Sequence, residues 1–179
     1  MDSPDYAASP DPGAEPGGLA RYAAVITVSD RGAAGERVDE SGPVAVHALR
    51  AGGFTCGEAR IVPDGEHSVA AALHAAIAEG ARLVVTTGGT GVSPRDQTPE
   101  GTARVLTREV PGIAEELRRI GAAEKPAGML SRGRAGIVDG PGALVVNLPG
   151  SPRAVASGMP VILAIAGHVL DQLAGGDHA

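Results

Sequence analysis

The sequence predicts an α/β fold in which helices cover a mostly parallel sheet. Runs rich in valine, isoleucine and threonine alternate along the chain with amphipathic, alanine-rich segments. Strands and helices that alternate in this way form layered folds built on parallel sheets. The 27 glycines are too many for a helical bundle and indicate many tight turns. Because aromatic residues make up only 2%, the core must be built from alanine, valine, leucine and isoleucine.

The first folded elements are expected directly after an N-terminal tail. Residues 1–20 are acidic, rich in proline and glycine and without apolar periodicity, so we expect a disordered tail followed by one domain over residues 21–179. The apolar run Tyr22–Ser29 predicts a buried strand. A helix should then begin at Glu40–Pro43, continue through Val44–Ala51 and end at Gly52-Gly53.

The middle of the chain repeats this alternation. Phe54–Val62 is a second, weaker strand candidate, because its centre is polar. Ser68–Ala78 is an alanine-rich amphipathic helix that should end at Gly80. Arg82–Thr87, with the sequence RLVVTT, is the clearest buried strand of the chain, and a glycine-rich loop follows it directly.

The last third contributes helices on both sides of a hairpin-like pair of strands. Pro99–Arg108 and Gly112–Ala123 are predicted helices, separated at Pro111. Two strands follow, on either side of a Gly-Pro-Gly turn, and a terminal helix that Pro160 could kink completes the chain. These last elements span Ala135–Val138, Ala143–Leu148 and Ser151–Leu173.

Composition argues against several classes of partner. Setting the four tail acids apart from the 21 in the chain leaves 17 acids against 15 bases, so the predicted domain is nearly neutral. Such a domain lacks the basic face that nucleic acids or anionic lipids would require. No secretory signal is visible, and the most apolar stretch, Met159–Leu170, is too short to span a bilayer. A single cysteine, Cys56, excludes an internal disulfide framework and is expected to be a partly buried packing residue. We therefore expect a cytoplasmic protein.

Four predicted strands end in small or polar residues. In parallel sheets, ligands bind beyond the carboxyl ends of the strands, so these segments are candidate walls of one site. They are Ser29-Asp30, Pro63-Asp64, Thr86–Gly91 and Asn147–Gly150.

The glycine-rich loop, TTGGTGVSPRDQT over residues 86–98, is the strongest candidate for an anion-binding site. Gly88, Gly89 and Gly91 allow sharp turns that bring N–H groups close to a phosphate, and the threonines add hydroxyl donors, namely Thr86, Thr87 and Thr90. The loop lacks the Gly-Lys-Ser/Thr of a nucleotide P-loop and the GxGxxG of dinucleotide-binding folds. The alternative interpretation is a tight turn without a ligand.

Two acids could place a metal beside that loop. Asp64 and Asp96 could share a Mg²⁺ ion, which typically takes one or two carboxylates together with phosphate oxygens. Each has a structural alternative: Asp64 lies in a turn sequence, and Asp96 could cap the following helix or pair with Arg95.

Further polar residues could contact an anion or a ring. Arg132, next to Ser131, could pair with a phosphate, whereas Ser151 after the NLPG segment is a helix N-cap candidate. The histidines do not cluster, and no pairing of histidine with cysteine suggests zinc.

Taken together, these motifs resemble the molybdopterin-binding Mog/MoaB family, which includes the gephyrin G domain. The resemblance covers about residues 21–173 in order. It rests on TVSDR at 27–31, SGP at 41–43, VPD at 62–64, TTGGTGVSPRDQTPE at 86–100, REVPG at 108–112, MLSR at 129–132 and NLPGSP at 147–152.

The resemblance implies a three-layer α/β/α domain that is usually a homotrimer. Active members are molybdopterin adenylyltransferases, which join the terminal phosphate of molybdopterin to the AMP part of ATP and release pyrophosphate with Mg²⁺. The product is later loaded with molybdate, which implies a molybdate-insertion partner enzyme.

The resemblance also assigns residue roles. Asp64 and Asp96 match acids linked to metal binding and catalysis, and Ser131 matches the serine beside the pterin phosphate. The remaining matches contribute to nucleotide and pterin binding: Ser29, Asp30, Thr87, Gly88, Gly89, Thr90, Gly91, Pro94, Arg95, Arg132, Asn147, Pro149 and Gly150.

One position departs from the family pattern. The chain has Gln97 in DQTP, where adenylyltransferases more often have DVTP, and this glutamine is similar to the MoaB branch, some of whose members look inactive. VPD and MLSR are intact, which favours the active enzyme. The alternatives are a protein that binds molybdopterin without chemistry and, with less support because the histidines are dispersed, a pterin dehydratase.

Overall fold

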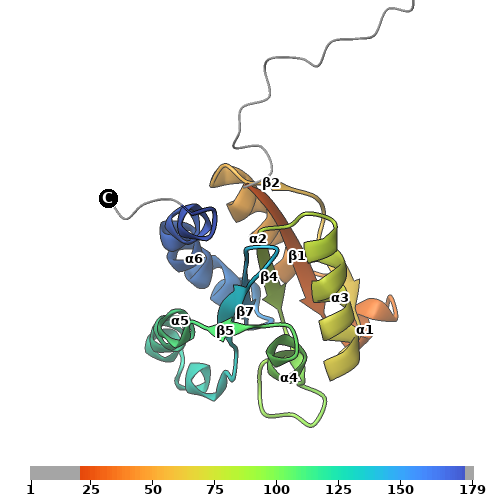
Figure 1. Cartoon of the computed structure of the whole chain (residues 1–179). Coiled ribbons are helices and arrows are strands. Elements are labelled where there is room, and N and C mark those ends of the chain that lie inside the picture. Colours follow the sequence, from red (N-terminus) through yellow and green to blue (C-terminus); the bar gives the residue numbers. More distant parts are fainter. Residues whose placement is uncertain (1–20, 176–179) are drawn as a thin grey trace, which may run out of the picture.

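The central layer of the structure, a computed structural model that describes residues 21–175, is a seven-stranded sheet (Figure 1). Its order is β2-β1-β4-β7-β6-β5, with β3 also paired to β1. The pairs that join β2, β3, β1, β4 and β7 are all parallel, and β6 is antiparallel to both of its neighbours, β7 and β5, so the prediction of a mostly parallel sheet is confirmed. The strands are β1 (Tyr22–Val28), β2 (Thr55–Cys56), β3 (Arg60–Val62), β4 (Leu83–Thr87), β5 (Arg108–Glu109), β6 (Ala135–Val138) and β7 (Ala143–Leu148).

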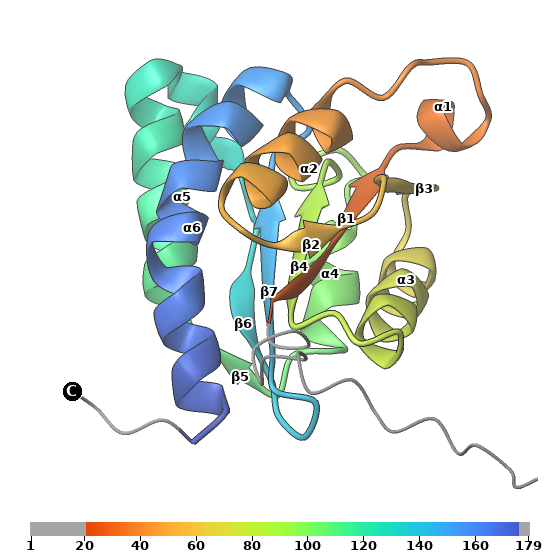
Figure 2. The same ribbon diagram turned by 90° about the horizontal axis from the view of Figure 1, so that it is seen from above.

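Helices cover both faces of this sheet and give the three-layer α/β/α arrangement (Figure 2). On one face α2, α5 and α6 pack against the sheet, and on the other α3 and α4 do so. The helical elements are α1 (Asp30–Ala33), α2 (Ser41–Ala51), α3 (Glu66–Ala78), α4 (Thr98–Ala103), α5 (Pro111–Glu124), the 3₁₀ helix η1 (Pro126–Leu130) and α6 (Pro152–Leu173).

The central strands are buried on both faces, which explains their continuous apolar sequences. All five residues of β4 are buried, and consecutive residues alternate between the two cores: Val85 packs with α2 and α6, whereas Val84 packs with α3. Thr86 and Thr87 extend this buried strand to the edge where the glycine-rich loop begins.

Two helix ends, the start of α6 and the end of α2, follow the expected sequence signals. The Ser151 hydroxyl accepts a hydrogen bond from the Ala154 N–H at 3.2 Å, so the predicted N-cap of α6 is confirmed. After α2, Gly53 adopts φ +84°, the left-handed conformation that glycine tolerates, and the helix ends there as predicted.

Two predicted elements were wrong in part. The single strand expected over 54–62 is split, because β2 and β3 pair with opposite ends of β1 and the three residues between them, 57–59, belong to neither strand. The helix expected over Pro99–Arg108 ends at Ala103. Its last residue instead enters strand β5, where Arg108 pairs with Ile137 of β6. Tertiary pairing with a sheet edge here overrides local helix preference.

Helix α6 runs through Pro160 without ending and is longer than the apolar stretch identified in the sequence. Among residues 21–175 it is the one helix long and apolar enough to cross a membrane by length and composition alone. One side of α6, which includes Val155 and Met159, is buried in the core against α2 and α5, and 33% of its apolar window is buried in this way. The disordered tail expected over residues 1–20 lies outside the described residues.

Candidate active site

A cavity of about 990 Å³ opens at the carboxyl ends of β1, β3, β4 and β7. All four polar strand ends predicted from the sequence contribute to its lining, which confirms that they meet. Every candidate site residue lines the cavity except Pro94 and Arg132. The lining candidates are Ser29, Asp30, Asp64, Thr87, Gly88, Gly89, Thr90, Gly91, Arg95, Asp96, Ser131, Asn147, Pro149 and Gly150.

The glycine-rich loop begins where β4 runs against β1. Gly88 has φ +94°, and a Cβ at this position would lie 2.3 Å from the carbonyl oxygen of Val28. Gly89 has φ +62°, and a Cβ there would meet the Thr98 hydroxyl at 2.4 Å. Both positions therefore require glycine, for backbone conformation and for space.

The carbonyl groups of residues 88–91 in this loop are each held by a donor from the protein. Thr98 donates its hydroxyl to Gly88 O at 2.9 Å and its N–H to Gly89 O at 3.1 Å. Arg132 donates its backbone N–H to Thr90 O at 2.8 Å and its Nε to Gly91 O at 2.7 Å. By contrast, the N–H groups of Gly89, Thr90 and Gly91 donate to no acceptor within residues 21–175. A loop whose carbonyls are occupied and whose N–H groups line a cavity is suited to an anion.

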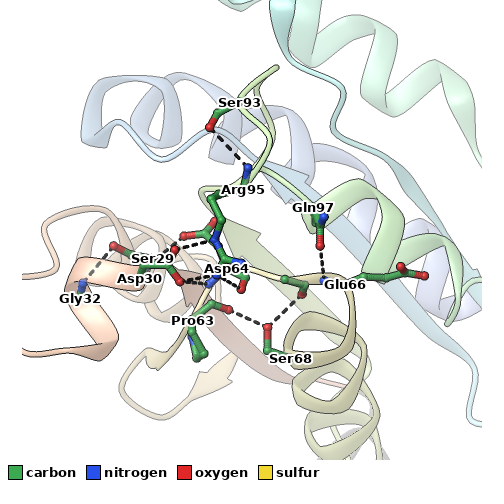
Figure 3. Close-up of polar contacts among 11 residues, drawn as sticks. Ser29, Asp30, Gly32, Pro63, Asp64, Glu66, Ser68, Ser93, Arg95 and Gln97 are labelled. Atoms are coloured by element: carbon green, nitrogen blue, oxygen red, sulfur yellow. Dashed lines mark hydrogen bonds and ion pairs between the residues drawn. The ribbon is translucent and has the colours of Figure 1, made fainter.

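Asp30 and Asp64 hold each other by reciprocal hydrogen bonds (Figure 3). The Asp30 N–H donates to Asp64 Oδ2 at 2.9 Å, and the Asp64 N–H donates to Asp30 Oδ1 at 3.0 Å. Arg95 completes the group: Nε and Nη2 each lie 2.9 Å from the Asp30 carboxylate, and Nη2 also donates to Asp64 O at 2.7 Å. These contacts fix the turns after β1 and β3 relative to each other.

The two carboxyl groups of this pair have opposite electrostatic environments. Hydrogen bonds from Arg95 lower the pKa of Asp30. Burial raises the pKa of Asp64, and the neighbouring charges of Asp30 and Asp96 raise it further. A carboxyl group with a raised pKa in a cavity is typical of a functional acid.

Asp96 lies over the far part of the glycine-rich loop. A Cβ on Gly91 would be 2.8 Å from Asp96 Oδ2, and a Cβ on Gly89 would be 2.9 Å from Asp64 Oδ1, so the two carboxylates stand above successive glycines of one loop. Asp96 Oδ2 accepts from the Ser93 N–H at 3.0 Å, within its own loop. It does not cap α4, whose N-cap is Gln97, so that alternative was wrong.

These two acids fit a Mg²⁺ ion that keeps phosphate and water ligands. Both offer hard oxygen donors beside an anion-binding loop, the ligand type that Mg²⁺ prefers. Within residues 21–175, no group of three or more His, Cys, Asp or Glu could hold a metal by itself. The donor set therefore suits a metal that arrives with a phosphate and does not suit a caged metal.

Arg132 does not point into the cavity as a phosphate ligand would. Its three guanidinium nitrogens donate to Gly91 O, the carboxylate of Glu100 and the carbonyl of Asp96. This pairing lowers the pKa of Glu100. Arg132 thus clamps the loop from behind, while Ser131 beside it faces the cavity.

Asn147 lines the cavity but is also a buried hydrogen-bond hub. Its Nδ2 donates to the hydroxyls of Thr86 and Thr102 at 2.9 Å each, and its Oδ1 accepts from the Arg134 N–H at 3.0 Å. These bonds use the polar atoms of the side chain, which is 3% exposed, so Asn147 positions β7 against β4 and α4.

Several lining residues were missed by the sequence analysis. Asp39 accepts from the Thr27 hydroxyl at 2.7 Å and from the N–H groups of Ser41 and Gly42, and it fixes the start of α2 at the cavity. An acid two residues before a helix start is a signal that could have identified it. Three cations also line the cavity: Arg118 from α5, Lys125 from the segment after α5 and Arg153 from α6. None of them lies at a strand end, so the argument from strand ends could not identify them.

Comparison with known proteins shows the family. Residues 24–168 match the family described as "Probable molybdopterin binding domain". The chain belongs to this family of molybdopterin-binding domains. It is 42% identical over 152 residues to a molybdopterin adenylyltransferase of Pyrococcus furiosus, which covers 82% of this chain and 87% of that one. A MogA structure superposes with a TM-score of 0.81 at 40% identity and covers 86% of this chain and 99% of that one.

A longer relative is also similar. The chain is 43% identical over 157 residues to a molybdenum cofactor biosynthesis bifunctional protein of Synechococcus elongatus. That match covers 88% of this chain but spans only about half of the relative, 49%. The shared part of these proteins is therefore this domain, and the family resemblance inferred from the motifs is confirmed.

Proposed function

We propose that this member of the molybdenum cofactor biosynthesis family adenylylates molybdopterin with Mg²⁺ and ATP, releasing pyrophosphate. The observation that carries the proposal is the position of two carboxylates, Asp64 and Asp96, beside a cavity-lining loop in which the N–H groups of residues 89–91 have no acceptor within residues 21–175. A binding protein requires the anion site but has no use for an acid of raised pKa beside it. The adenylyltransferase name of the Pyrococcus furiosus relative supports the same reaction.

The reaction forms one phosphorus–oxygen bond and breaks another. An oxygen of the terminal phosphate of molybdopterin attacks the α-phosphorus of ATP, and pyrophosphate leaves with the electron pair of the broken bond. Since both reactants are anions, positioning and charge neutralisation are the main tasks of the protein. A Mg²⁺ ion held by Asp64 and Asp96 would neutralise phosphate charge at this point.

The residues of the chain divide these tasks. The N–H groups of Gly89, Thr90 and Gly91 would hold phosphate oxygens, and the Ser131 hydroxyl faces the same space. Arg95 lines the cavity and its side chain is 61% exposed, so a phosphate that enters the cavity would compete with Asp30 for its guanidinium. The cations Arg118 and Lys125 at the other end would attract the second anionic reactant.

A pyrophosphate-release assay tests the proposal. Wild-type protein supplied with Mg²⁺ and ATP should release pyrophosphate only when molybdopterin is added, and adenylylated molybdopterin should appear by mass spectrometry. The second candidate, a MoaB-like protein that binds molybdopterin without chemistry, predicts binding but no pyrophosphate. This alternative was raised by Gln97, which does not line the cavity, and it also fits the similarity of the chain to MoaB structures.

The remaining features implied by the resemblance are part of the same proposal. We expect a homotrimer in the cytoplasm and a separate activity that inserts molybdate into the product. Mass photometry of the purified chain measures the first of these directly.

A further inference from the structure

Gln97, the residue that departs from the family pattern, has a defined structural partner. Its side chain points toward the start of α3, where Oε1 accepts a hydrogen bond from the Glu66 N–H at 3.1 Å (Figure 3). Gln97 is half-buried and does not line the cavity. Its contact is therefore with the protein itself.

The start of α3 needs this acceptor, because the N-cap of the helix supplies none. The N-cap is Gly65, which has φ +143° and no side chain that could accept from the first N–H groups of the helix. Ser68 is occupied elsewhere, since its hydroxyl bonds to the carbonyls of Pro63 at 2.7 Å and Gly65 at 2.9 Å. Gln97 thus caps α3 from another segment of the chain.

The position of this hydrogen bond in the sequence matters more than its strength. Gln97 directly follows Asp96, and Glu66 lies two residues after Asp64. The bond therefore joins the two segments that carry the acids of the candidate active site. It crosses from the loop before α4 to the turn before α3.

Other contacts between these segments are exposed. Arg95 donates to Asp64 O, but its side chain is 61% exposed and lines the cavity. Arg104 pairs with Glu66 with both side chains exposed. When Arg95 is engaged by a substrate, two partly buried links remain: the packing of Gly101 in α4 against Glu66, and the Gln97 bond, which is the one that directly follows Asp96 in sequence.

We propose that Gln97 is a positioning residue: its hydrogen bond to the Glu66 N–H keeps the spacing of Asp64 and Asp96 fixed while Arg95 is engaged by an anion. The proposal rests on the proposed function for its catalytic consequence, but its structural part is independent of activity. It also explains how a glutamine in the DQTP segment is compatible with an active enzyme.

Backbone dynamics test the structural part. Gln97→Met keeps the length of the side chain but lacks the acceptor, whereas Gln97→Glu keeps an acceptor at the N-terminus of α3. In ¹⁵N relaxation measurements we expect Gln97→Met to lower the order parameters of residues 92–97 and 64–66 together, from about 0.85 to below about 0.7. Gln97→Glu should retain the wild-type values. If Gln97→Met leaves residues 92–97 as ordered as in the wild type, the proposal is overturned.

Kinetics with a matched control test the catalytic part. Ser68→Ala removes another hydrogen bond at the start of α3 without touching the Asp96 loop. We expect Gln97→Met to lower kcat about tenfold with KM for molybdopterin nearly unchanged, because misplaced groups cost rate more than binding. Gln97→Glu should restore kcat, and Ser68→Ala should leave it near the wild-type value.

The outcomes separate the two proposals. Equal losses of kcat in Gln97→Met and Ser68→Ala would mean general loosening of α3 and would overturn the positioning role. Absence of pyrophosphate release from the wild-type protein would instead overturn the proposed function, and the relaxation measurements would still decide whether Gln97 orders the Asp96 loop.

Discussion

At the end of β7, the polar groups of Asn147 are hydrogen-bonded within the protein, and so are those of Arg132 behind the glycine-rich loop. On the β3 side, Asp64 lies beside the charges of Asp30 and Asp96, and burial raises its pKa. Both sides come from segments that the motifs single out. The difference separates residues that build the site from residues that can act in it. The polar groups around Asn147 and Arg132 already have hydrogen-bond partners and need no ligand, whereas a bound cation would relieve the repulsion among the carboxylates around Asp64.

The largest expected effect is the loss of activity when Asp64, in the carboxylate cluster, is replaced. Asp64→Asn keeps the shape of the side chain, and its carbonyl can still accept from the Asp30 N–H, but it lacks the charge needed for a metal-bound phosphate. We expect kcat/KM for pyrophosphate release to fall about 10³-fold or more, the scale of losing a preorganised charge at the reacting centre. The melting temperature should not fall, because a cluster of like charges is relieved.

Circular dichroism on the same variant supplies the control. A loss of activity accompanied by a large drop in melting temperature would show that Asp64 is structural, and the comparison between the two sides would break down. Retained activity in both Asp64→Asn and Asp96→Asn would contradict the two-acid mechanism.

Replacing Asn147, whose polar groups are all hydrogen-bonded, should mainly lower stability. Asn147→Leu is close in size but removes three buried hydrogen bonds and leaves Thr86 and Thr102 without a partner. We expect unfolding free energy to fall by about 2–4 kcal/mol, because buried polar groups that lose partners are costly. The melting temperature should drop by roughly 5–10 °C. Urea titration measures the loss, and a change below about 1 kcal/mol would show that the hub is not needed for stability.

Arg132 gives a smaller effect that distinguishes a clamp from a ligand. Arg132→Lys keeps the charge but cannot contact Gly91, Glu100 and Asp96 at once. As a clamp, it should lose both about 1–2 kcal/mol of stability and about tenfold in activity. Were Arg132 a direct phosphate ligand, activity would fall while the melting temperature stayed constant.

Much of the site was predictable because strand ends carry strong local signals. Burial on both faces of β4 is recorded in its continuous apolar sequence, and parallel strands bring Asp64, the glycine-rich loop and Asn147 to one edge. The replacement of the end of the predicted helix by strand β5 was not predictable, because the pairing of Arg108 with Ile137 is a contact between segments far apart in sequence.

The roles of individual side chains were harder to predict than their location. An arginine beside a glycine-rich loop suggests a phosphate ligand, yet Arg132 is directed to the backbone of the loop by Glu100 and the carbonyls. Asp39 and the cations Arg118, Lys125 and Arg153 were missed, because hydrogen-bond satisfaction and the packing of helices around the cavity emerge only in three dimensions. Strand patterns therefore locate the site, and the hydrogen-bond pattern identifies what each residue can do there.

The smallest expected effect is a pH dependence of the stability difference between the wild type and Asp64→Asn. Because the folded-state pKa of Asp64 is raised above the usual value of 3.8, ionising this carboxyl group destabilises the fold relative to the unfolded chain. The cost is fully present above the folded-state pKa and disappears as the pH falls through it toward 3.8.

Asp64→Asn, which never ionises, should thus melt above the wild type near pH 7, and the gap should close in acid. Asp64 is only half-buried, so solvent screening keeps the gap within about 1 kcal/mol, or roughly 2–4 °C. Melting curves of both proteins between pH 4 and pH 8 measure it, and a gap that widens in acid would reverse the sign inferred for Asp64.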